Sequence, residues 1–331
     1  MHARRIDLLS GRHAAGAGFW LLAFALLWLA PTRLLLLNEI VILALFALSL
    51  DLILGYAGIV SLGHAAFFGV GAYVAGLLAK HGMSDPLLGL VIAGGVAALL
   101  GLVSSVLVLR GSDLTRLMVT LGVALILREL ANKLDWITGG ADGLTGVIMG
   151  PVLGMFEFDL FGRTAYLYSL TCLLVLYLLA RRLVRSAFGL SLLAIKGNPV
   201  RAAAMGIPIS RRLIAIYMVA AGYAGIAGAL LAQTTQFVSL DVLEFHRSAD
   251  VLLVLVLGGT GRLYGAIAGA VVFKLMYDWL AGLTPQYWQF WIGLVLVVIV
   301  LLGRGGILGL FDPLRAWRRG GAGVGAAEAK P

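Results

Sequence analysis

The sequence predicts an all-α integral membrane protein of about ten transmembrane helices, and its composition and its apolar runs both point to this class. Of the 331 residues, 61% are hydrophobic and 12% are charged, whereas soluble domains have about 45–50% and about 25%. Such a chain has too little charge to cover a soluble surface. The apolar runs at 34–54 and 87–109 reach the roughly 20 residues needed to cross about 30 Å of hydrocarbon.

The spans follow one another closely, and some are expected to be short or broken at glycines. The first follows Arg4, Arg5 and Arg12, as a signal peptide would, but another hydrophobic span resumes directly after Arg33. This favours an uncleaved first helix. The eighth span is short and charged at its start, so it either crosses fully or is re-entrant. The expected spans are 17–31, 34–54, 59–79, 87–109, 114–132, 164–181, 212–233, 244–258, 263–282 and 287–303.

The charges between the spans predict the orientation of the chain. Segment 181–212 holds seven Lys or Arg residues and no Asp or Glu, whereas segment 132–163 holds four acidic residues against two basic ones. Since short cytoplasmic loops are enriched in Lys and Arg, the first segment is expected inside and the second outside. Ten crossings then place both termini in the cytoplasm. The net charge of +9 therefore belongs to loops beside a membrane lipid surface, and no nucleic-acid partner is expected.

Small residues recur every four positions in two spans. One row is Gly261, Gly265 and Gly269, and the other is Ala221, Gly225 and Ala229. Rows of this kind allow helix backbones to approach closely inside lipid. We expect both rows to serve helix packing.

Two glycine-rich breaks, at 54–58 and 257–261, follow apolar runs that begin near Asp51 and Asp250. They are either ordinary turns at the membrane edge or interruptions whose backbone faces a transport cavity. Glycine would let polar backbone reach a zwitterionic solute there. On that second interpretation the candidate substrate path comprises Gly55, Gly58, Ser61, Gly63, His64, Gly258, Gly259 and Gly261.

Ionisable residues inside the spans need a partner, a cavity or an interfacial position. Arg128 and Glu129 are expected at the outer headgroup level, and Lys274 and Asp278 are spaced to pair on one helix face. The remaining candidates for a proton relay or a solute contact are Glu39, Asp51 and His64. His64 is more simply a packing residue.

Several kinds of catalytic chemistry are not indicated by any motif. No lysine is followed by Ser or Thr, so no phosphate-binding loop of the GxxxxGK[ST] type occurs. There is no His and Cys spacing for a zinc site and no GxSxG nucleophile turn. We expect no enzymatic activity, no metal and no cofactor in this subunit. If transport uses ATP, another chain must hydrolyse it.

The cytoplasmic segment 186–212 is predicted to contain a short apolar helix. Asn198 and Pro199 form a suitable start, residues 200–205 favour helix, and Gly206 forms a stop. This helix either rests on the membrane surface or inserts into a groove of a partner protein. Docking to a partner is the preferred interpretation.

Five stretches, in order, resemble the LivM-type permeases of branched-chain amino acid ABC transporters. Their similarity covers roughly residues 35–310. They are 51–73 (DLILGYAGIVSLGHAAFFGVGAY), 138–146 (TGGADGLTG), 201–207 (RAAAMGI), 256–266 (VLGGTGRLYGA) and 304–309 (RGGILG).

The resemblance implies an ABC importer permease fold in a bacterial cytoplasmic (inner) membrane. It implies a second permease subunit, two ATPase subunits that bind the ATP, and a periplasmic or extracellular solute-binding protein. Chain 1–331 would be one permease domain, with a cytoplasmic N-terminus (1–16), an external loop (132–163), a cytoplasmic coupling loop (186–212) and a cytoplasmic tail (304–331). Coupling to an ATPase would involve Arg201, Ala202, Ala203, Met205 and Gly206.

The family pattern and this sequence differ just before that helix. Family members usually carry acidic residues there, whereas this chain has Lys196, Gly197, Asn198 and Pro199. Branched-chain or related hydrophobic amino acids are the implied substrates, and the family also includes carriers of urea, amides and other amino acids. Two functions outside the family are a proton-coupled secondary carrier, which would use the ionisable residues above, and a passive channel.

Overall fold

The computed structural model describes residues 18–111, 113–159 and 161–283, together with residues 287, 290, 291, 293, 294 and 297. These residues form helices connected by turns and loops. Only two isolated β-bridges occur in this part of the chain, Leu144 with Val238 and Val152 with Phe156. The prediction of an all-α protein is therefore confirmed for the described residues.

The helices follow the predicted order, although several are shorter than expected. The elements are a first helix Gly18–Leu29, η1 (Pro31–Arg33), α2 (Leu34–Asp51), the π-helix η2 (Leu52–Tyr56), α3 (Ala65–Lys80), α4 (Pro86–Val108), α5 (Asp113–Lys133), α6 (Asp135–Thr138), η3 (Gly140–Asp142), α7 (Arg163–Arg185), α8 (Ala187–Gly197), α9 (Pro199–Ala204), α10 (Ile209–Thr235), η4 (Leu240–Leu243), α11 (Phe245–Gly258) and α12 (Leu263–Leu283).

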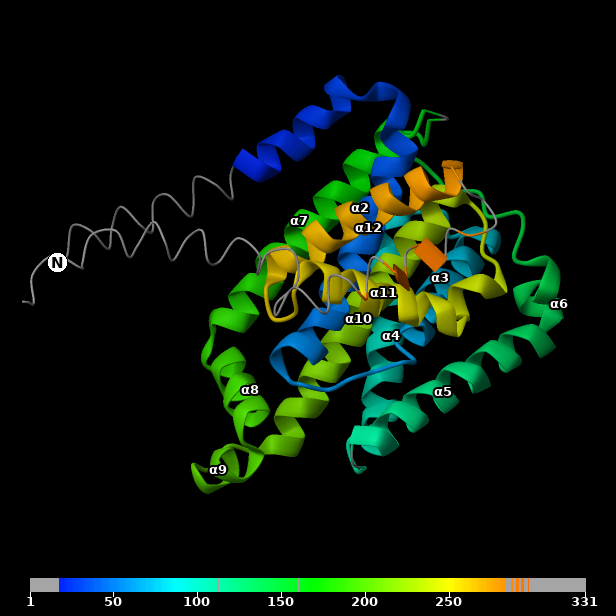
Figure 1. Cartoon of the computed structure of the whole chain (residues 1–331). Coiled ribbons are helices and arrows are strands. Elements are labelled where there is room, and N and C mark those ends of the chain that lie inside the picture. Colours follow the sequence, from blue (N-terminus) through cyan, green and yellow to red (C-terminus); the bar gives the residue numbers. More distant parts are fainter. Residues whose placement is uncertain are drawn as a thin grey trace, which may run out of the picture.

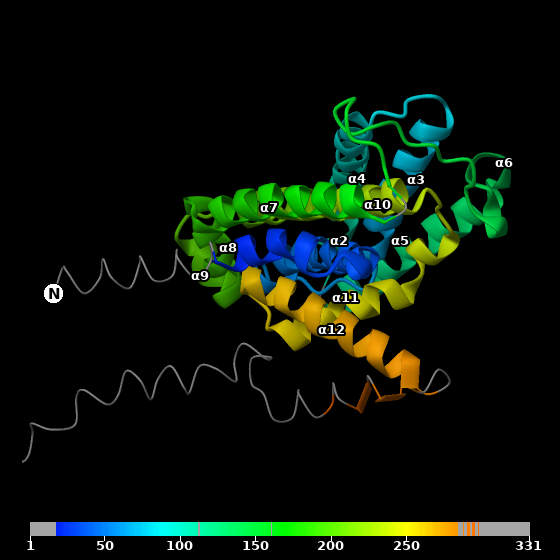
Figure 2. The ribbon, with the colours of Figure 1, turned by 90° about the horizontal axis from the view of Figure 1, so that it is seen from above.

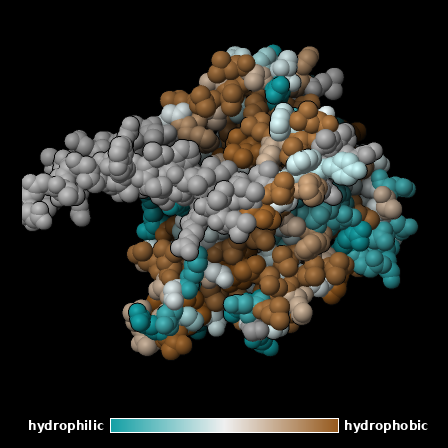
Figure 3. All heavy atoms as spheres, in the orientation of Figure 1, coloured by the Kyte–Doolittle hydropathy of each residue, from teal (hydrophilic) through white to brown (hydrophobic). Residues whose placement is uncertain are grey.

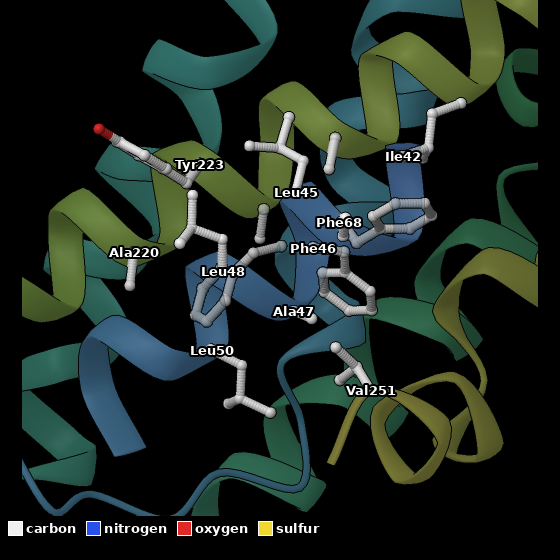
Figure 4. Close-up of a cluster of buried hydrophobic side chains, with 14 of the residues drawn as sticks. Ile42, Leu45, Phe46, Ala47, Leu48, Leu50, Phe68, Ala220, Tyr223 and Val251 are labelled. Carbon is white, nitrogen blue, oxygen red and sulfur yellow. The ribbon is translucent and has the colours of Figure 1, made fainter. Parts of the chain in front are cut away.

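Helix α2 runs through the middle of the bundle. It packs against α7, α10 and α12, and the view from above shows it between the α7–α10 pair and α12 (Figure 2). Its side chains are apolar on every side, which is the pattern of a helix buried all round. Figure 4 shows Leu45, Phe46 and Leu48 of α2 among Phe68 of α3 and Ala220 of α10. This central position means that any interruption of α2 lies inside protein.

Close backbone contacts hold α10 against α3 and α4. A Cβ on Gly228 would collide with the carbonyl oxygen of Phe68 in α3, and a Cβ on Gly225 would approach the side chain of Ala97 in α4. In α12, a Cβ on Gly269 would collide with the backbone of α11. The prediction of helix packing is confirmed for Gly225 and Gly269, whereas Gly261 of the first row lies in the turn that precedes α12.

Among the described residues, five helical segments are long and apolar enough to cross a membrane: Pro31–Tyr56, Pro86–Val108, Arg163–Arg185, Ile209–Thr235 and Leu263–Leu283. Their outward side chains are largely apolar. In Figure 3 brown residues cover much of the visible surface, while teal residues gather near α9 and α6 (compare Figure 1). An apolar surface between two polar ends is what a bilayer-spanning bundle requires.

Of the remaining expected spans, α5 and α11 have nearly the predicted bounds, whereas the first helix and α3 are shorter than predicted. The third begins at Ala65 rather than at 59, and its 16 residues in α3 extend only about 24 Å. The 14 residues of α11 extend only about 21 Å. Most of the tenth span, 287–303, and the whole of the termini 1–16 and 304–331 lie outside the described residues. The number of crossings therefore stays a prediction.

The close contact at Gly228 provides a test of the packing. Replacing Gly228 by Ala should lower thermal stability in detergent, by about 1–3 kcal/mol, because the added methyl group forces α10 away from α3. The matched control is Gly95→Ala in α4, where a Cβ would meet open space within the described structure and the helix should be unharmed or slightly stabilised. Equal melting temperatures for the two variants would contradict this packing.

Candidate functional site

The two glycine breaks predicted from the sequence meet in space. The backbone N–H of Gly261 donates a hydrogen bond to Oδ1 of Asp51, with 2.7 Å between nitrogen and oxygen. A Cβ on Gly55 would lie 2.6 Å from the Gly261 nitrogen, which is closer than a side chain tolerates. We call Asp51, residues 55–58 and residues 258–261 the glycine junction. It joins the end of α2 to the turn between α11 and α12.

The first break begins as a widening of α2. The helix passes into the π-helix η2 and then into a non-helical segment, 57–64, before α3 begins. Gly58 has a φ of +74°, a conformation that residues with a side chain rarely adopt. Single turns of π-helix inside α-helices occur frequently at functional sites. The segment from Gly55 to His64 therefore interrupts the helical path between α2 and α3, and its place relative to the membrane stays a prediction.

Contacts from two other helices fix the non-helical segment. The backbone N–H of Leu62 donates to Oγ1 of Thr120 in α5 at 3.3 Å, and that of Ala65 donates to Oγ of Ser248 in α11 at 2.9 Å. Gly63 lies so close to the carbonyl of Thr120 that any side chain would collide with it. Ser61 is buried. Inside a bilayer such irregular backbone is tolerated only where protein groups satisfy it.

His64 occupies a packed, fully buried position. Its Nε2 lies 2.8 Å from Oγ of Ser49, and its ring stacks on Phe46 with 5.6 Å between ring centroids. The ring also meets the edge of Phe67. These contacts favour the interpretation of His64 as a packing residue that ties the non-helical segment to α2.

The other ionisable candidates have partners of their own. Glu39 forms an ion pair with Lys274 of α12, so the pairing of Lys274 with Asp278 expected from their spacing is replaced by a contact between helices. Asp51 accepts from Gly261. Glu39 and Asp51 lie on the same helix, about 18 Å apart along its axis. That separation and these partners give no direct path for a proton between them.

The second break lies against the start of α12. Gly259 follows α11 with a φ of +94°, and Gly261 has a φ of +76°. A Cβ on Gly258 would collide with the carbonyl of Gly265 in α12. Glycine is thus required both by backbone conformation and by close approach, and the turn folds α12 back along α11.

A residue that was not among the predicted site residues also reaches the junction. Nζ of Lys196, in the last turn of α8, donates to the carbonyl oxygen of Gly55 at 2.7 Å. Its side chain also packs on Gly58, where a Cβ would lie 3.1 Å from Cγ of Lys196. Lys196 is separated from Gly55 by 141 positions, and no sequence pattern links them.

The short helix predicted near 200–205 is present as α9. Asn198 caps it by accepting from the N–H of Arg201 at 2.9 Å, Pro199 occupies its first turn, and Gly206 follows it with a φ of +80°. This confirms the predicted start and stop. Ala202 faces the protein and is buried, whereas Arg201, Ala203 and Met205 are exposed. Met205 is 62% exposed and Val200 is 79% exposed, so α9 presents apolar surface at its end of the bundle.

At the opposite end, near α6, charged residues form a connected group. His246 lies between Asp241 (3.2 Å) and Glu244 (2.9 Å). The two carboxylates also bind Arg247 and Arg128, respectively, so Arg128 of α5 forms an ion pair with Glu244, the residue just before α11. The ligand atoms of the three central residues are close enough to hold a metal ion. Because each carboxylate already has an arginine partner, the group is accounted for as an ion-pair network.

A cavity of about 170 Å³ lies between the first helix, α2, α7 and α12. Its wall is apolar and includes Trp20, Val41, Leu170 and Ile267. It is separate from the glycine junction in its lining residues. An apolar wall offers no groups for the charged ends of an amino acid, so this cavity does not suit a zwitterionic solute.

Comparison with known proteins places these features in context. The model of the family described as "branched-chain amino acid transport system / permease component" matches residues 32–300. The chain is 28% identical over 305 residues to the high-affinity branched-chain amino acid transport system permease protein LivM of Escherichia coli (strain K12), with 84% of this chain and 70% of the relative covered. No solved structure matches the chain.

Two further relatives carry different names. The probable branched-chain amino acid transport permease protein LivH of Methanocaldococcus jannaschii is 27% identical, with 71% of this chain and 75% of the relative covered. The galactose/methyl galactoside import permease protein MglC of Haemophilus influenzae is also 27% identical, with 62% and 63% covered. Similarity therefore extends to permeases named for amino acids and for sugars.

The hydrogen bond between Asp51 and Gly261 provides a test of the junction. Asp51→Leu should destabilise the protein in detergent by about 1–3 kcal/mol relative to Asp51→Asn, because only Asn keeps an oxygen acceptor for the partly buried N–H of Gly261. Thermal unfolding of the two purified variants measures the difference. If both variants melt at the same temperature, this bond does not hold the two breaks together.

Proposed function

Because this chain belongs to the family of permease components of branched-chain amino acid transport systems, we propose that it is the membrane-spanning subunit of an ATP-driven importer for branched-chain or related hydrophobic amino acids. The observation that carries this proposal is α9, an exposed and partly apolar short helix, fixed by its caps between α8 and α10. An exposed apolar helix of this kind suits a groove on a partner protein. The partner proposed here is one of two separate ATPase subunits.

The proposed orientation puts the α9 end of the bundle in the cytoplasm of a bacterial inner membrane. The coupling loop (186–212), both termini and the tail (304–331) would then be cytoplasmic, as the excess of Lys and Arg in 181–212 supports. The loop at 132–163 would face outward. There it would receive a solute-binding protein, and a second permease subunit would complete the path.

The proposed substrate path runs past the glycine junction. The backbone at the two helix breaks would line this path. The residues concerned are Gly55, Gly58, Ser61, Gly63, His64, Gly258, Gly259 and Gly261. Polar backbone at a break is the kind of group that binds a zwitterion inside a membrane. ATP-driven movement of α9 would switch the packed helices between outward- and inward-facing arrangements.

Branched-chain amino acids are favoured over sugars as the substrate. The matching family model is described by branched-chain amino acid transport, and the protein named LivM is 28% identical over 84% of this chain. A fructose import permease is 26% identical over 83% of the chain, so the preference rests on the family description and the higher identity. A proton-coupled carrier is less well supported, because Glu39, Asp51 and His64 each have a protein partner.

The docking role of α9 predicts the effect of Ala203→Arg. The substitution introduces a long, charged side chain at an exposed position of α9. Burying an unpaired charge in an apolar groove is costly. The ATPase should therefore fail to co-purify with the variant, while it co-purifies with the control Met155→Arg, which changes a residue that is 80% exposed and lies in the loop before α7. A variant that retains the ATPase, or one that transports normally without it, would contradict the proposal.

Uptake by the reconstituted complex tests the energy source and the substrate. Vesicles containing the permeases, the ATPases and the binding protein should accumulate leucine only with ATP, and a protonophore should not abolish uptake. Excess galactose should leave leucine uptake unchanged. Uptake that collapses with the proton gradient would indicate the secondary carrier, downhill flux without ATP would indicate the passive channel, and galactose accumulation would indicate a sugar permease.

A further inference from the structure

We propose that Lys196 is a positioning residue that transmits movement of α9 to the glycine junction. The inference rests on the proposed function, because it takes α9 to be the helix that the ATPase moves. It adds a specific residue and a specific contact.

Lys196 is rigidly joined to α9 through Asn198. The N–H of Asn198 donates to the carbonyl of Ala194 at 3.1 Å, which ends α8, and its side chain caps α9 through Arg201. The same residue is thus the C-cap of one helix and the N-cap of the next. A displacement of α9 is therefore transferred to the last turn of α8, where Lys196 lies.

The side chain of Lys196 contacts both glycines of the first break. Its ammonium group donates to the carbonyl oxygen of Gly55, while its Cγ approaches Gly58. A long side chain of this type can place its methylene groups along one surface and its charge at another. Lys196 itself is exposed on α8, whereas Gly55 is buried. The side chain consequently reaches from the surface of the coupling loop to the interior of the bundle.

Gly55 is the point at which three helices meet. It lies in the π-helix that ends α2, and it directly abuts the Gly261 nitrogen between α11 and α12. Asp51, which accepts from the N–H of Gly261, lies one turn before Gly55 on the same helix. Pulling on the Gly55 carbonyl would therefore change the contact that holds α2 to the α11–α12 turn.

A coupling role for Lys196 predicts a result that a purely structural role does not. Removing the ammonium group should leave the ATPase bound to α9, because Lys196 is not on the docking helix. It should nevertheless weaken the link between ATP hydrolysis and helix movement. The affected quantity is the amount of solute transported per ATP hydrolysed, rather than assembly or basal hydrolysis.

The experiment uses the complete reconstituted complex carrying Lys196→Met, Lys196→Arg or the control Lys133→Met. Leucine uptake and ATP hydrolysis are measured on the same assembled complexes. Lys196→Met should lower the leucine transported per ATP by about fivefold, within the range by which residues between coupled sites change coupling. Lys196→Arg, which keeps a charged donor, should restore most of it. Lys133→Met removes only an exposed pairing with Glu129 at 4.0 Å and should match the wild type.

The outcomes separate this inference from the proposed function. If the wild-type complex contains no ATPase, or transports without ATP, the proposed function fails. If the wild type is ATP-driven and Lys196→Met transports the same amount per ATP, the role of Lys196 fails. A variant that only assembles poorly, with unchanged transport per ATP in the complexes that form, also overturns it, since that result describes a structural lysine. Should Lys196→Met not assemble at all, the same comparison is made with Lys196→Gln.

Discussion

The hydrogen bond between Asp51 and Gly261 meets the constraint on which the rest of this architecture depends. Inside hydrocarbon there is no water to satisfy broken backbone, so a helix interruption is stable only when protein groups take over its hydrogen bonds. Here one interruption supplies the N–H and the other supplies the carboxylate. Thr120 and Ser248 satisfy two more N–H groups at the other end of the first break. The two breaks are therefore stable together in a way that neither would be alone.

Small residues make this arrangement geometrically possible. Without a hydrophobic drive between helices in lipid, association depends on close packing. Gly228 brings α10 against α3, and Gly269 brings α12 against α11. These contacts surround the central α2, so its end at the junction is held from several sides. The abundance of glycine, 44 of 331 residues, thus serves two purposes in this protein, packing along the helices and flexibility of backbone at the breaks.

Local sequence patterns predicted much of the fold, while long-range contacts were outside their reach. Predictions that depend on residues close in sequence were confirmed for the cap of α9, for five long apolar helices and for the close packing of Gly225 and Gly269. The spacing of Lys274 and Asp278 suggested a pair within one helix, but Glu39 on α2 takes that lysine. Likewise, Lys196 and Gly55 meet only because α8 folds back to the end of α2. The hydropathy pattern also overestimated the length of α3. Residues 59–64 are apolar enough for a helix, yet they belong to the break.

The position of the junction limits how the bundle could move. At the junction itself, helices α2, α11 and α12 meet through one partly buried hydrogen bond and one close backbone approach, although α12 also packs along α2 and α11. Helix α10, in contrast, meets α3 and α4 through an extended interdigitated surface. Packed surfaces of the second kind resist sliding, because every close contact must be broken at once. The contacts at the glycine junction are few and local, so fewer of them would have to break for that part to move. If the bundle has two arrangements, the α3–α4–α10 group is therefore the part expected to stay rigid, and the α2 end and the α11–α12 turn are the part expected to shift. Rearrangement at such element ends is the usual form of hinge motion.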